Sequence, residues 1–99
     1  MMNKEQIILK LSSNRQILRE FHVKALYLFG SVVRGDETQT SDVDLLVEFE
    51  DAVSVGLFEF ARLQRMLSAI LDCKVDLATP DALHKALKGR IMEEAVRAA

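Results

Sequence analysis

Two pairs of polar residues, Gly30-Ser31 and Asp42-x-Asp44, stand where one apolar run of the chain ends and the next begins. A glycine lets the backbone approach a ligand closely. If a helical turn starts at Ser31, its free N–H groups and the serine hydroxyl suit phosphate oxygens. The Gly-Ser pair therefore predicts half of a phosphate-binding site.

Asp42 and Asp44 are two residues apart, so on a strand both carboxylates emerge on one face. Carboxylates that close repel each other unless a cation compensates, and Mg²⁺ binds carboxylates together with substrate phosphates. Taken singly, a Gly-Ser turn and a solvated Asp-x-Asp at a strand entrance are common. Both at this spacing, between two apolar runs, predict a nucleotide and metal site.

Two further residues have a functional and an ordinary interpretation. Arg34 could neutralise phosphate charge or could be a solvated cation. Val75 and Leu77 are predicted to face one side of a short strand, which leaves Asp76 on the other side. Asp76 could therefore meet the aspartate pair, or it could be a surface acid at a strand end.

The stretch Phe29–Gly35, followed by Ser41–Val47, resembles the signature of the DNA polymerase beta-like nucleotidyltransferase superfamily. Within that superfamily it is similar to the small minimal nucleotidyltransferase (MNT) proteins. The segment Lys74–Leu83 resembles the family's later strand, which carries a third carboxylate, here Asp76. The resemblance covers nearly the whole chain.

The resemblance implies a set of residues for this site. Two Mg²⁺ ions would be held by the catalytic residues Asp42, Asp44 and Asp76. The phosphates of ATP would be held by Gly30, Ser31 and Arg34. Asp76 would lie nearest the acceptor, either as a metal ligand alone or also as the group that takes the acceptor's proton.

The resemblance also implies a function. MNT proteins with an intact motif act as antitoxins beside a HEPN-domain ribonuclease toxin and transfer AMP from ATP to a toxin tyrosine. Two alternatives stay open. The chain could mask the toxin without catalysis, through residues 53–58 or its C-terminal helix, or it could transfer a nucleotide to a small molecule, although enzymes of that kind usually carry an added domain.

Composition bounds the other possibilities. The chain has 99 residues, which fits a single domain over residues 1–99. It is 49% hydrophobic with a formal net charge of -2, so it lacks the basic field that favours nucleic acid. No apolar run approaches the roughly 20 residues of a membrane span, and the N-terminus does not resemble a secretion signal, so we expect a cytoplasmic protein. The single Cys73 cannot form an internal disulfide.

The apolar pattern predicts the elements that position these residues. Asn3 and Gln6 resemble a capping pair for a helix over residues 4–20. Buried strands are predicted over 25–29 and 43–49, and a shorter strand over 74–77. Gly56 is expected to open a helix, residues 79–81 to start another, and residues 90–98 to form a last one. This order predicts an α/β fold, a small mixed sheet with helices packed on it.

Overall fold

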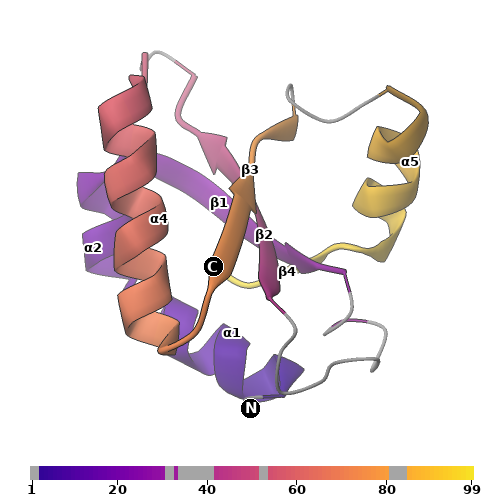
Figure 1. The fold of residues 1–99 in the computed structure, drawn as a ribbon, viewed down its shortest axis with the longest axis horizontal. Helices are drawn as coiled ribbons and strands as arrows, with labels where there is room; N and C mark the ends of the chain where they lie inside the picture. Colours follow the sequence, from indigo (N-terminus) through magenta and orange to yellow (C-terminus); the bar gives the residue numbers. More distant parts are fainter. Residues whose placement is uncertain (1–2, 31–32, 34–41, 52–53, 81–84) are drawn as a thin grey trace.

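The computed structural model describes residues 3–30, 33, 42–51, 54–80 and 85–99 of the chain. Two helices and two strands come first along the chain, and a helix, a strand, a helix and a short strand follow (Figure 1). Their bounds are α1 Lys4–Ser12, α2 Arg15–Glu20, β1 Val23–Phe29, β2 Val43–Phe49, α4 Leu57–Leu71, β3 Val75–Ala78, α5 Lys85–Glu94 and β4 Val96–Arg97. The predicted α/β fold is confirmed.

The strands form one mixed sheet in the order β3-β2-β1-β4. β1 pairs antiparallel with β2 and with β4, whereas β2 pairs parallel with β3. Helices α1, α2 and α4 lie on one side of the sheet and α5 lies on the other (Figure 1). The two strands that flank the Gly-Ser and Asp-x-Asp motifs are therefore the central pair.

The predicted helix over residues 4–20 is divided in two. Its start is as expected, because the Asn3 side chain accepts from the Gln6 N–H and the Gln6 side chain accepts from the Asn3 N–H, both at 2.9 Å. The break follows from side chains that compete with the helix backbone. Ser13 Oγ donates to the Leu9 carbonyl and Asn14 Nδ2 donates to the Lys10 carbonyl, each at 2.7 Å.

One buried core lies between the sheet and the three helices on its first side. β2 contributes Val43, Leu45 and Val47, and α4 contributes Leu63 and Leu67, all at most 1% exposed. Because side chains alternate along a strand, Asp44 and Leu46 belong to the opposite face of the sheet. α4 therefore packs on one face of β2, and the second face carries Asp44.

The C-terminal prediction was wrong. Helix α5 ends at Glu94 and continues through Gly89, and Val96–Arg97 forms a strand where a helix over residues 90–98 was expected. In this strand Val96 pairs with Leu28 and Arg97 with Tyr27 of β1. A two-residue strand is too short to show an alternating pattern in the sequence. It forms because the edge of β1 is available for pairing, which the sequence does not reveal. The helix start expected at residues 79–81 falls partly outside the described residues.

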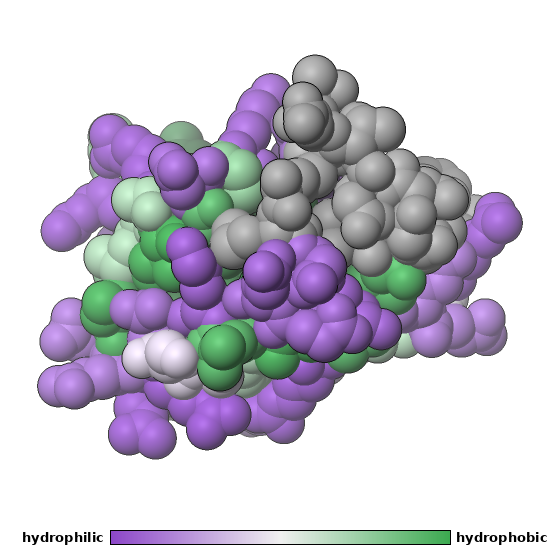
Figure 2. All heavy atoms as spheres, turned by 90° about the horizontal axis from the view of Figure 1, so that it is seen from below, coloured by the Kyte–Doolittle hydropathy of each residue, from purple (hydrophilic) through white to green (hydrophobic). Residues whose placement is uncertain are grey.

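The described helices include none that is long and apolar enough to cross a membrane. Seen from the end at which α1 lies, the surface is dominated by hydrophilic side chains with apolar patches between them (Figure 2).

Candidate functional site

Asp44 and Asp76 lie opposite each other on neighbouring strands. They are direct register partners of the parallel pair β2 and β3, so their side chains leave the same face of the sheet. Val43 and Val75 precede them and are buried on the helix face, each 1% exposed. Asp76 faces away from Val75 and Leu77, as expected. Both neighbours are buried on the helix side of the sheet, and Asp76 is exposed on the other side.

Gly30 closes the site beside Asp44. It follows β1 directly, where Phe29 pairs with Asp44, and its φ of +82° lies in the region that favours glycine. A Cβ added at Gly30 would contact the Asp44 carboxylate and would lie 3.0 Å from its Cγ. The absence of a side chain at Gly30 is therefore what allows the backbone to lie against this carboxylate.

Asp42 stands just before β2, and its side chain is 38% exposed. Its Oδ2 lies 3.7 Å from Nζ of Lys74, the residue that precedes β3. The sequence interpretation missed this partner. Lys74 and Asp42 each lie directly before the register pair Val43 and Val75, and that relationship becomes readable only once β2 and β3 are known to be parallel and in this register.

The remaining site residues are not all described. Ser31 and Arg34 lie outside the described residues. Within the described part of the chain, no group of three or more His, Cys, Asp or Glu side chains is close enough to hold a metal ion. The structure thus aligns Asp44 with Asp76 and places Gly30 beside Asp44, while the Asp42 side chain lies toward Lys74.

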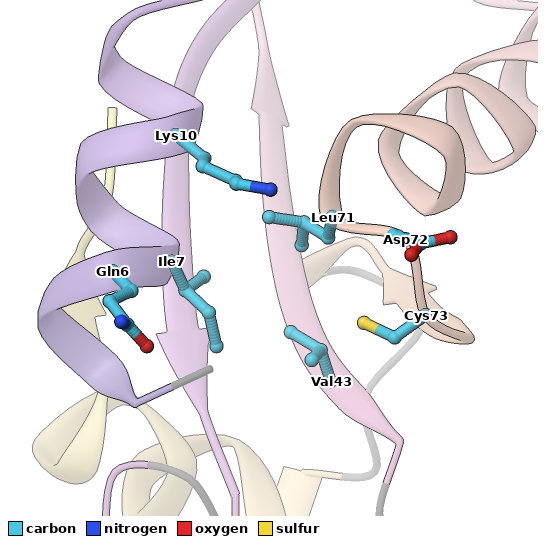
Figure 3. A pocket seen from close by; sticks show the side chains of 7 residues that line it. All are labelled: Gln6, Ile7, Lys10, Val43, Leu71, Asp72 and Cys73. Atoms are coloured by element: carbon cyan, nitrogen blue, oxygen red, sulfur yellow. The ribbon is translucent and has the colours of Figure 1, made fainter. Parts of the chain in front are cut away.

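A hollow of about 430 Å³ opens between α1, the start of β2 and the end of α4. Figure 3 shows Lys10 and Gln6 of α1 on one side of it, and Asp72 and Cys73 on the other. Its β2 residue is Val43, whose side chain points to the helix face. None of the candidate aspartates lines this hollow, so it is separate from the site built on Asp44 and Asp76.

Cys73 lines the same hollow as a free cysteine. Burial of its thiol, with the negative charges of Asp72 and Asp42 nearby, raises its pKa, and Lys10 opposes that shift. Cys73 is therefore held as a thiol rather than a thiolate near neutral pH. This favours a packing role for Cys73 over a reactive one.

Comparison with known proteins decides the family. The family model "Nucleotidyltransferase domain" matches residues 11–98. The chain belongs to the nucleotidyltransferase family. Its relatives include the protein adenylyltransferase MntA of Thermococcus cleftensis, which is 37% identical over 97 residues, or 97% of this chain and 96% of that protein. The expectation that this chain is a nucleotidyltransferase is thereby confirmed.

Solved structures of the same fold agree. One, provisionally described as a minimal nucleotidyltransferase, superposes with a TM-score of 0.79 at 29% identity, covering 96% of this nucleotidyltransferase and 95% of that chain. A toxin-antitoxin structure with AMP-PNP gives a TM-score of 0.73 at 23% identity, over 93% and 72% of the two chains. A tri-AMPylated Shewanella oneidensis HEPN toxin in complex with an MNT antitoxin gives 0.66 at 21%, over 94% and 71%. The minimal nucleotidyltransferase fold is confirmed.

Proposed function

We propose that this nucleotidyltransferase transfers AMP from ATP to a hydroxyl group, a tyrosine, of a partner HEPN-domain ribonuclease toxin, and so acts as an antitoxin. The single observation that carries the catalytic part is the register pairing of Asp44 with Asp76 on one face of the sheet, with Gly30 beside Asp44. The protein adenylyltransferase MntA relative and the structures with AMP-PNP and with an AMPylated toxin support the choice of donor and acceptor.

In the proposed reaction, the acceptor oxygen attacks the α-phosphorus of ATP. The bond from that phosphorus to the β-phosphate oxygen breaks, pyrophosphate leaves, and the hydroxyl proton passes to solvent. Gly30 brings backbone close to the distal phosphates, with Ser31 and Arg34 as the side chains that bind them. Asp76, on β3, lies farther from the Gly30 end of the site than Asp44 does, which supports the proposed position of Asp76 nearest the acceptor.

The residues fit Mg²⁺ by their chemistry. Asp42, Asp44 and Asp76 supply carboxylate oxygens, the ligands that Mg²⁺ shares with substrate phosphates. When bound, the metal supplies charge neutralisation of the phosphates and activation of the attacking hydroxyl. Asp42 can join the set by leaving Lys74, because Lys74 is 78% exposed and an exposed ion pair at 3.7 Å contributes little stability.

The test is transfer of radiolabelled AMP from ATP, with Mg²⁺, to the proposed partner, a HEPN-domain protein encoded by a neighbouring gene. We expect label on the toxin from the native chain and none from the double variant Asp42→Ala with Asp44→Ala. Equal labelling by both proteins would refute the catalytic proposal.

The masking alternative differs in a cellular result. If the chain only covers the toxin, the same double variant protects cells from the toxin as well as the native chain does at equal expression. If the transfer reaction protects the cell, protection is lost with the carboxylates.

A further inference from the structure

The outer edge of β3 has backbone groups that point away from the sheet. β3 is the terminal strand in the order β3-β2-β1-β4. The Lys74 carbonyl accepts from the Val43 N–H at 3.0 Å, so the alternation of a parallel ladder turns the backbone groups of Val75 and Leu77 outward. The Val75 carbonyl accepts instead from Gln64 Nε2 of α4, at 2.9 Å. Leu77, which is 8% exposed, directs its N–H and C=O to the same outer side, where a further strand could pair.

A groove lies between this edge and α4. Its hollow measures about 550 Å³ and is lined by Phe58, Ala61 and Arg65 of α4 and by Lys74 and Val75 at the start of β3. A second hollow, of about 430 Å³, lies toward the other end of β3 and includes Leu57 and Thr79. The first hollow touches β3 at its first residue and the second lies at Thr79, just after its last.

The side chains of this groove favour an apolar anchor with acidic neighbours. Phe58 is 85% exposed and Leu57 is 80% exposed, a costly arrangement for large apolar groups unless another surface covers them. Arg65 and Lys74 are both exposed and line the same hollow as Phe58. The charge of Arg65, and that of Lys74 once Asp42 has left it for the metal, complements carboxylates on a bound segment.

The outer edge of β3 lies next to the candidate site. Gly30 follows β1, Asp44 lies on β2 and Asp76 lies on β3, so the site residues succeed one another across neighbouring strands. A strand added outside β3 would be the next in this row, about 4.8 Å beyond it. Its alternate side chains would leave the sheet on the Asp76 face, and the others would enter the groove with α4.

We propose that the acceptor protein binds as an extended segment paired to the outer edge of β3, in the groove beside α4. Addition of a strand at a sheet edge is a recurring mode of peptide recognition, in which the backbone gives affinity and alternate side chains give specificity. The acceptor hydroxyl residue faces the Asp76 side. Residues an odd number of positions from the acceptor residue face the groove instead. We expect one of them to be apolar and to pack over Phe58, and another to be acidic and to lie near Arg65 and Lys74. This inference rests on the proposed transfer to a protein hydroxyl.

Steady-state kinetics test the groove. With the HEPN-domain toxin as acceptor, we expect Phe58→Ser to raise KM for the toxin about tenfold, in the range of an interface anchor, with kcat and the affinity for AMP-PNP unchanged. Arg65→Glu should raise KM in the same direction. Leu9→Ser is the matched control, because Leu9 is 66% exposed on α1, away from the groove, and its loss should leave KM unchanged.

Amide hydrogen exchange tests the strand pairing itself. With saturating toxin, the Leu77 N–H should exchange at least about tenfold more slowly, because it gains a hydrogen bond from the added strand. The Asp76 and Ala78 amides face β2 and should change little. Slower exchange confined to α4, with Leu77 unchanged, would show contact without strand addition and would overturn the proposal.

The outcomes separate this inference from the proposed function. If the native chain transfers no AMP to the toxin, the proposed function fails. If it transfers AMP and Phe58→Ser and Arg65→Glu have the KM of the native chain, only the groove assignment fails. If Phe58→Ser instead converts a dimer to a monomer with KM unchanged, the groove is occupied by a second copy of the chain, which also overturns the inference.

Discussion

Asp44 and Asp76 are register partners on parallel strands, and their carboxylates leave the same face of the sheet. Like charges directly across a ladder are destabilising. Without a divalent ion, Asp76→Asn should therefore raise the free energy of unfolding, by up to about 1 kcal/mol because Asp76 is exposed. Chemical denaturation in EDTA measures it, and a loss of stability would show that Asp76 has a structural role.

The same variant should lose activity and its response to Mg²⁺. Charge stabilisation by a bound metal is worth several kcal/mol, so we expect AMP transfer to fall by at least about 100-fold. Added Mg²⁺ should raise the melting temperature of the native chain more than that of the variant. Glu48→Gln is the control, since Glu48 is on β2 on the same face but four residues beyond Asp44.

Gly30→Ala should disrupt both fold and site. An L residue at a φ of +82° costs about 1–2 kcal/mol, and the added Cβ also contacts the Asp44 side chain. Gly89→Ala is the matched control, because Gly89 lies inside α5 with open space around it and should gain up to about 1 kcal/mol. Thermal unfolding of the two variants in parallel checks both signs.

The Asn3 cap should be measurable. Asn3→Ala removes the side-chain acceptor for the Gln6 N–H at the start of α1 and should cost about 0.5–2 kcal/mol. Asn3→Ser keeps a capping oxygen and should restore most of that loss. If the alanine and serine variants unfold at the same denaturant concentration, the cap contributes nothing.

Cys73 should react slowly with iodoacetamide at neutral pH. Its pKa is raised by burial and by the charges of Asp72 and Asp42, so little of the nucleophilic thiolate is present. The rate should climb as pH rises toward that pKa, later than for free cysteine. Asp72→Asn lowers the pKa and should speed alkylation at a fixed pH, whereas Lys10→Ala raises it and should slow alkylation.

The sequence predicted which face each site residue occupies, but it did not predict which residues lie opposite each other. The alternation of Val43 with Asp44, and of Val75 with Asp76, is local, so the facing of each side chain could be predicted before the strands were placed. That Asp44 lies opposite Asp76, rather than one residue along, depends on the register of β2 and β3, which only tertiary packing sets.

The features that the sequence analysis missed have two physical origins, one local and one tertiary. The division between α1 and α2 depends on Ser13 and Asn14 bonding to backbone carbonyls, a local competition that apolar periodicity does not report. The strand at Val96–Arg97 exists because β1 offers a free edge to pair with. The ion pair of Asp42 with Lys74 joins two residues brought together by the parallel pairing of β2 and β3.

The order of the strands has an evolutionary consequence. Gly30 follows β1 and the outer edge of β3 lies on the far side of β2, so the segment proposed to bind the donor and the edge proposed to bind the acceptor share no residue. Relatives could diversify α4 and β3 to follow a changing target while the donor half stays constant. A chimaera carrying those two elements from a relative should inherit that relative's target.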